Sequence, residues 1–120
     1  MKKSLLAFGL LAVSLSLFSQ DVTGTWNGLL VVPGAQLRIV FHISAAENGL
    51  TATMDSPDQG AYGIPVTSVT YEGEEVRIGM TDIDLVYTGK LTSKNKDLID
   101  GTLVQMGQTF EMDLKRKAEE

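Results

Sequence analysis

The sequence predicts an all-β protein, a single antiparallel up-and-down β-barrel of about eight strands. Apolar and polar residues alternate with a period of two along most of the chain after residue 19, which is the pattern of strands with one buried face. The connections between these runs are short and rich in glycine and polar residues, as in hairpins. No stretch after residue 19 shows a convincing 3.6-residue helical period.

Eight alternating runs give the predicted strands in chain order. They span residues 23–32, 37–44, 49–55, 64–71, 75–80, 84–92, 97–105 and 109–115. In the second run, positions 37, 39, 41 and 43 are large and apolar, whereas Arg38 and His42 share the opposite face. A flat sheet of such strands would expose unpaired edges, so closure into a barrel is the simplest arrangement.

Four aromatic side chains are expected to plug the barrel interior: Trp26, Phe41, Tyr87 and Phe110. Each lies at a core-facing position of its run. An eight-stranded barrel can be filled by its side chains or can hold one small ligand. Because the inward-facing set is bulky, we expect a mostly filled interior.

The connections differ between the two ends of the predicted barrel. Alternate turns of a meander emerge at the same end, so AAENG, EGE and SKNKD share one end, and VPGAQ, DSPDQGAYG, MTD and MGQ share the other. The first set is short and highly charged, as solvent-facing hairpins are. The second set contains the longest connection, residues 55–63, and offers uncharged amide and phenol groups.

The second end supplies the candidate ligand-binding or partner-binding residues: Gln36, Asp55, Ser56, Asp58, Gln59, Tyr62 and Gln108. Three readings stay open. The loop covers its own end of the barrel, forms a contact surface for another protein or domain, or borders the mouth of a small-ligand site. In the first case, proline and glycines at suitable positions favour a rigid loop. Loops carried by a rigid scaffold are favoured binding sites.

Residues 1–19 have the three parts of a secretory signal: a basic start, an apolar stretch over residues 5–17, and a small residue, Ser19, before the cleavage point. A membrane anchor is the alternative, but the apolar stretch is shorter than the roughly 20 residues that a span needs. We therefore expect a cleaved signal peptide, a secreted or periplasmic protein and no membrane anchor. The barrel domain is expected at residues 20–115, followed by a polar tail or linker at residues 116–120.

Charge and cysteine content restrict the partners. Without Lys2 and Lys3, 8 basic and 15 acidic residues remain, which gives a net charge of −7. This sign repels nucleic-acid phosphates, so no nucleic-acid partner is expected. The chain has no cysteine, which excludes a disulfide and a cysteine-based zinc site.

The sequence offers little for catalysis or metal binding. It contains no G-x-S-x-G motif, and nothing in it places a nucleophile and an orienting acid beside its only histidine, His42. Asp82 and Asp84 have a D-x-D spacing but lack the longer ligand series of a calcium loop. The sequence therefore predicts no enzymatic activity, no metal and no cofactor.

The stretch VTGTWNG, residues 22–28, resembles the G-x-W opening of the lipocalin and streptavidin group of small barrels, where the tryptophan plugs one end. A second resemblance covers nearly the whole chain after residue 19. It rests on DVTGTWNG, QLRIVFHIS, TATMDSPDQGAYGIPV, Gly101-Thr102 and Gly107-Gln108-Thr109-Phe110. These motifs resemble the domain that commonly precedes an α/β-hydrolase (serine peptidase or esterase) domain in secreted bacterial proteins. The resemblance implies a barrel without an established catalytic role, because the catalytic serine, acid and histidine lie in the hydrolase domain.

Three functions remain as expectations. The first is a secreted, non-catalytic accessory module that docks another protein or a hydrolase domain. The second is a lipocalin-like binder of a small apolar ligand. The third is the N-terminal portion of an α/β-hydrolase that lacks its catalytic domain.

Overall fold

A computed structural model describes residues 22–92 and 94–117. None of these residues is α-helical. They form ten strands and two 3-10 turns: β1 (Gly24–Val32), β2 (Ala35–Ala46), β3 (Gly49–Ser56), η1 (Pro57–Gln59), β4 (Ala61–Pro65), β5 (Ser68–Glu72), β6 (Glu75–Met80), η2 (Thr81–Ile83), β7 (Leu85–Thr92), β8 (Asn95–Gln105), β9 (Gln108–Glu111) and β10 (Leu114–Arg116). The prediction of an all-β fold is confirmed.

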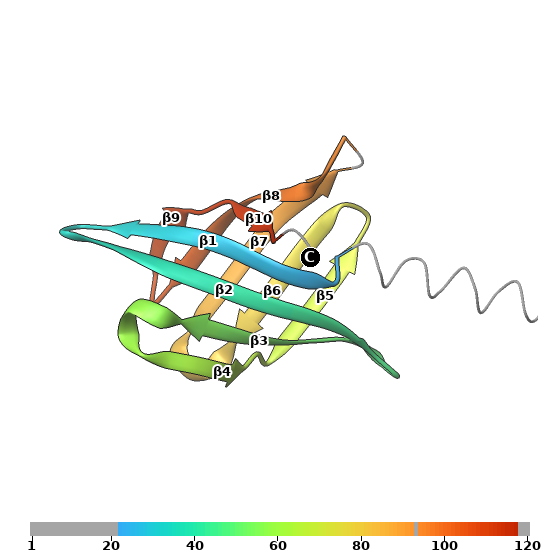
Figure 1. Cartoon of the computed structure of the whole chain (residues 1–120), viewed down its shortest axis with the longest axis horizontal. Helices are drawn as coiled ribbons and strands as arrows, with labels where there is room; N and C mark the ends of the chain where they lie inside the picture. The colour runs from blue at the N-terminus through green and yellow to red at the C-terminus, as the bar shows by residue number, and fades with distance from the viewer. Residues whose placement is uncertain (1–21, 93, 118–120) are drawn as a thin grey trace, which may run out of the picture.

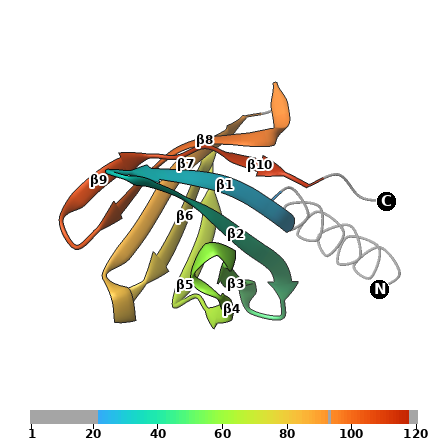
Figure 2. The same cartoon turned by 60° about the vertical axis from the view of Figure 1, so that its left-hand side comes forward.

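The strands form one curled antiparallel sheet, as the two views in Figures 1 and 2 show. Its order is β4-β3-β2-β1-β10-β8-β7-β6-β5, and β9 pairs with β8 beside this path. Consecutive strands are neighbours along most of the path, so the predicted up-and-down barrel is also confirmed. The barrel is open along one side, because β4 and β5 are the two ends of the path and do not pair with each other.

The predicted strand 64–71 is two strands, β4 and β5. The N–H of Val66 donates to the Ala52 carbonyl of β3 over 3.1 Å, whereas the N–H of Thr67 donates to the Gly79 carbonyl of β6 over 2.9 Å. The chain therefore changes partner between two adjacent residues. Side-chain alternation reports which face is buried and says nothing about the hydrogen-bond partner, so the break was not predicted.

The predicted strand 109–115 is also two strands, β9 and β10. After β9, the N–H of Met112 donates to the Gly101 carbonyl over 3.0 Å, and β10 then inserts between β1 and β8. Gly28 permits this insertion, because a Cβ atom there would lie 2.8 Å from the Leu114 side chain and 3.1 Å from the Asp113 carbonyl oxygen.

The core occupies the concave side of the sheet and includes three of the four predicted aromatic residues. Trp26, Phe41 and Tyr87 are fully buried, whereas Phe110 is half-buried and packs at the margin of the core. The Tyr87 hydroxyl donates to the Met112 carbonyl over 2.7 Å, and burial, with the nearby carboxylates, raises the pKa of this phenol far above its usual range. Gly101 leaves room for that hydroxyl, which would lie 2.2 Å from a Cβ atom at this position.

Arg116 covers Trp26 at one end of the barrel. Its guanidinium carbon lies 4.3 Å from the centroid of the indole ring, a cation–π geometry. The same side chain donates to the Asp97 carboxylate, to the Lys96 carbonyl and to the Thr23 carbonyl. Strand β10 thus reaches one residue into the segment expected to be a tail, since Arg116 is both a strand residue and a packing residue.

The expected signal peptide, residues 1–19, lies outside the described residues, as do residues 118–120 of the expected tail. Within the described part, no helix has the length and apolar character that crossing a bilayer requires.

Candidate contact surface at the loop end

The connection after β3 is a compact turn that returns the chain along the same strand. Pro57–Gln59 form the 3-10 turn η1, and Gly60 ends it in the left-handed conformation at φ 69°, with its N–H bound to the Pro57 carbonyl. Strand β4 then begins at Ala61, opposite Ser56. The loop is therefore shorter than the predicted nine residues, because its last part joins the sheet. Figure 1 shows it at the same end as the β1–β2 hairpin and the β8–β9 turn, as expected from alternate turns.

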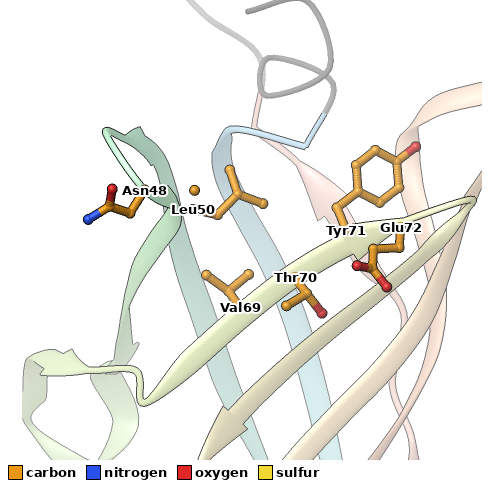
Figure 3. A pocket seen from close by; sticks show the side chains of 7 residues that line it. Asn48, Leu50, Val69, Thr70, Tyr71 and Glu72 are labelled. Atoms are coloured by element: carbon orange, nitrogen blue, oxygen red, sulfur yellow. The ribbon is translucent and has the colours of Figure 1, made fainter. Parts of the chain in front are cut away.

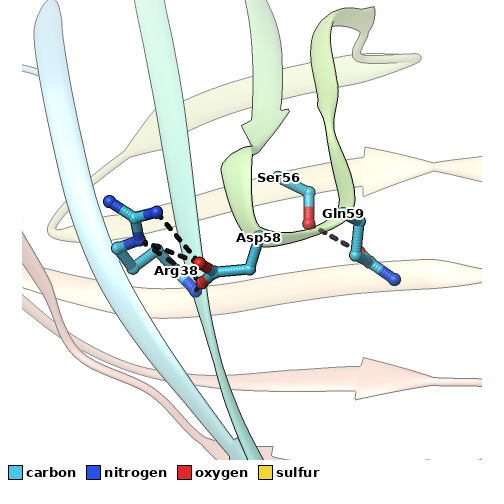
Figure 4. Close-up of polar contacts among 4 residues, drawn as sticks. All are labelled: Arg38, Ser56, Asp58 and Gln59. Atoms are coloured by element: carbon cyan, nitrogen blue, oxygen red, sulfur yellow. Dashed lines mark hydrogen bonds and ion pairs between the residues drawn. The ribbon is translucent and has the colours of Figure 1, made fainter.

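Asp58 fixes the loop to β2 through Arg38 (Figure 4). Its carboxylate accepts the backbone N–H of Arg38 over 2.8 Å and the guanidinium Nη2 over 2.9 Å. The hydrogen bonds from Arg38 hold the pKa of Asp58 below its usual range. The Arg38 side chain stays 64% exposed, so this ion pair lies at the surface.

Asp55 makes a second brace inside the loop. Its carboxylate accepts the backbone N–H of Gly63 over 2.8 Å and contacts His42 Nε2 at 2.7 Å. The N–H of Gly63, followed by His42, lowers the pKa of this carboxyl. Gly63 has a φ of 66°, a conformation that favours glycine and aims its N–H at Asp55.

His42 stands between Thr25 and Asp55 on the outer face of the sheet. Thr25 Oγ1 lies 3.2 Å from Nδ1, and Asp55 Oδ2 lies 2.7 Å from Nε2. Neither group was assigned to His42 from the sequence. Thr25 of β1 lies directly opposite His42, whereas Asp55 of β3 lies opposite Val40 and reaches His42 diagonally. Because Asp55 also holds the loop through Gly63, we interpret the Thr25–His42–Asp55 contacts as a brace.

Ser56 is a structural residue of the loop, because it is only 2% exposed. Its hydroxyl donates to Gln59 Oε1 over 2.5 Å, which orients the exposed Gln59 (Figure 4). A buried hydroxyl needs such a partner. Ser56 therefore supports the surface and does not face a partner.

The remaining predicted residues lie outside this hydrogen-bonded cluster. Tyr62 is 66% exposed at the start of β4. Gln36 and Gln108 are exposed near the beginnings of β2 and β9. The β8–β9 turn has its own anchor, since the N–H of Met106 donates to the Asp84 carbonyl over 3.0 Å. The structure thus assembles four of the seven predicted residues, and adds Arg38, His42, Gly63 and Thr25.

We call the exposed side chains of Arg38, Asp58, Gln59 and Tyr62 the loop surface. They come from β2, η1 and β4. Tyrosine and arginine are enriched at protein interfaces, and the hydrogen bonds beneath them hold the backbone in one shape. The arrangement can therefore offer a fixed mixture of aromatic, amide and charged groups to another molecule.

Comparison of the chain with models of known protein families, with curated proteins and with solved structures finds no match. The loop surface is therefore interpreted from its own geometry.

Proposed function

We propose that the chain is a secreted, non-catalytic β-barrel module that docks another protein or domain through the loop surface. One observation carries the proposal. The loop is braced at three points, by the Arg38–Asp58, Asp55–Gly63 and Ser56–Gln59 contacts, yet Tyr62 beside it is 66% exposed. A surface that is already ordered loses less conformational entropy when a partner binds.

The packing of the interior supports docking over storage of a small ligand. Trp26, Phe41 and Tyr87 fill the inside of the barrel and are fully buried, and the rings of Phe41 and Tyr87 lie 6.2 Å apart between centroids. A lipocalin-like carrier of an apolar guest would need this space. The resemblance to domains that precede α/β-hydrolases suggests the partner class, a hydrolase domain.

The proposal is tested by photocrosslinking and substitution. A photoreactive side chain at Tyr62 should capture a defined partner from the source organism, whereas the same group at Lys94, an exposed residue at the other end of the barrel, should not. The double variant Asp58→Ala, Gln59→Ala should keep the circular dichroism spectrum of the parent and weaken the purified complex by about tenfold, the effect of losing an interface contact worth more than about 1 kcal/mol.

The matched control is Lys94→Ala, which should leave the affinity unchanged. If the double variant and Tyr62→Ala both bind the partner with the affinity of the parent protein, the loop surface has no role in docking.

A further inference from the structure

The open side of the barrel forms a seam between β3 and β5, which we define as residues 48–52 and 69–72. Strand β4 covers only the second half of β3, since its register runs from Thr53 to Ser56. The seam is closed at Val66, which still bonds to Ala52. From there the two strands diverge toward the β2–β3 and β5–β6 turns (Figure 3).

Backbone groups on both sides of the seam point into it. In an antiparallel pair, the N–H and C=O of alternate residues face opposite edges. The Ala52 carbonyl faces β4, so the N–H and C=O of Leu50, two residues earlier, face the seam. On β5, the pair Glu72–Glu75 closes a two-residue hairpin, so the backbone groups of Glu72 face β6. By the same alternation, the N–H and C=O of Val69 face the seam. Unpaired strand edges accept a further strand.

The seam contains a pocket of about 320 Å³ that has an apolar floor and a polar rim. Leu50, Val69 and Tyr71 supply the apolar side chains, and all three belong to or pack against the hydrophobic core. Asn48, Thr70 and Glu72 supply the polar side chains. A strand laid in the seam would meet both chemistries at alternate positions, because its own side chains alternate between the two faces.

The hairpins beside the seam are acidic. Glu47 lies in the β2–β3 turn, and Glu72, Glu74 and Glu75 lie in the β5–β6 hairpin, all of them exposed. Glu72 and Glu75 stand directly opposite each other, which is unfavourable for like charges. The nearest cross-strand basic residues are Lys90, opposite Glu75, and Arg77, opposite Thr70. A cationic occupant would relieve the remaining repulsion.

We propose that the β3–β5 seam binds an extended peptide segment of another protein by strand addition. The segment carries apolar side chains toward Leu50 and Val69 and lysine or arginine at the alternate, outward positions. Backbone hydrogen bonds provide the affinity of such complexes, and the alternate side chains provide the specificity. This site is separate from the loop surface, which lies at the opposite end of the barrel (Figure 1).

The test is hydrogen exchange and binding with a capped heptapeptide of alternating lysine and valine. Binding should slow the exchange of the Leu50 and Val69 amides, because strand addition gives these groups partners. The double variant Glu72→Lys, Glu74→Lys should weaken the peptide by about tenfold at low salt, and by less at about 1 M salt, where charges are screened within ~3 Å. The control Asp82→Lys, Glu111→Lys makes the same charge change outside the seam and should leave binding nearly intact.

Four results would overturn the proposal. If a matching peptide of alternating glutamate and valine bound as tightly as the lysine–valine peptide, the acidic hairpins would not select a cationic segment. Binding without protection of Leu50 and Val69 would indicate surface adsorption. Protection of these amides by self-association at rising concentration, with no peptide present, would assign the seam to a second copy. Protection of these amides by palmitate and not by the peptide would assign the seam to a lipid.

The double variant Asp58→Ala, Gln59→Ala should leave peptide binding unchanged. A failure of the seam proposal is therefore distinguishable from a failure of the loop-surface proposal.

Discussion

Two of the predicted strands are each broken into two strands, and only one of these breaks opens the barrel. At Met112–Asp113 both halves remain beside β8, because β9 and β10 pair with different parts of the same strand. At Val66–Thr67 the halves join opposite ends of the sheet, β4 to β3 and β5 to β6. A break in a strand is therefore harmless when both halves keep a common neighbour. When they do not, an edge and a seam result.

The closed side is also locked by side chains. The Tyr87 hydroxyl binds the Met112 carbonyl at the break itself, and Arg116 of β10 covers Trp26 of β1. On the open side, the polar contacts hold the loop onto β2, and within residues 22–92 and 94–117 the backbone partners at this edge of β3 reach only residues 52–56. Changes on the closed side should therefore alter global stability, and changes on the open side should alter local opening.

The largest expected effect is the loss of Trp26, over which the closed side is built. Trp26→Ala should lower the free energy of unfolding by about 3–5 kcal/mol, the usual cost of deleting a core aromatic. Denaturant unfolding followed by circular dichroism measures this. Leu29→Ala, at a 46% exposed position of the same strand, should stay within about 0.5 kcal/mol, the surface range. A loss below about 1 kcal/mol for Trp26→Ala would mean that the indole is not part of the core.

A smaller effect is expected at the closed break. Tyr87→Phe removes the hydroxyl and leaves the buried Met112 carbonyl without this donor, so it should cost about 1–3 kcal/mol. The measurement is the same unfolding experiment. A neutral result would show that the pairing of β9 and β10 with β8 keeps the barrel closed without this hydrogen bond.

Acid should loosen the loop on the open side without unfolding the barrel. The pKa values of Asp55 and Asp58 are lowered in the folded protein, so the unfolded chain takes up protons first as the pH falls. Their contribution is complete above the ordinary aspartate pKa of about 3.9 and is lost as the pH falls through the lower folded values. The amide shifts of Gly63 and Arg38 should therefore titrate below about pH 3.9. A midpoint at or above that value would contradict the two braces.

The smallest effect is a difference in local opening along the open side. Hydrogen exchange of the Gly63 and Arg38 amides, which bind carboxylates, should be slower than that of Leu50 by about tenfold or more, since unpaired edge amides exchange without an opening step. Asp58→Asn should reduce this difference at Arg38 and leave Gly63 unchanged. Equal rates for Arg38 and Leu50 in the parent protein would mean that the Arg38–Asp58 contact does not persist in solution.

Much of the fold could be predicted because alternation is a local property. Each of the eight predicted runs overlaps at least one strand, and Trp26, Phe41 and Tyr87 are buried as expected. Phe110 is only half-buried, because β9 is a short strand beside the main path of the sheet. A single barrel strand over residues 109–115, as predicted, would have carried this ring inward.

The candidate site could be predicted in part. The loop and its polar residues were found from composition, but Arg38, His42 and Thr25 were not assigned to it. Arg38 and His42 lie on the polar face of the predicted strand 37–44, and Asp55 lies on the same face of the next predicted strand. Opposite charges on one face of neighbouring strands were therefore an available signal. The position of Asp58 beside Arg38 depends on the fold of η1 and was not available.

The amino-acid pattern alone predicts an antiparallel sheet with one apolar face, because the polarity of successive side chains is set residue by residue. Three features depend on the folded chain: where it changes partner, which carboxylates brace the loop and where an edge remains open. Those features depend on groups that meet across 8 to 20 residues of chain, and a backbone N–H has no side-chain signature.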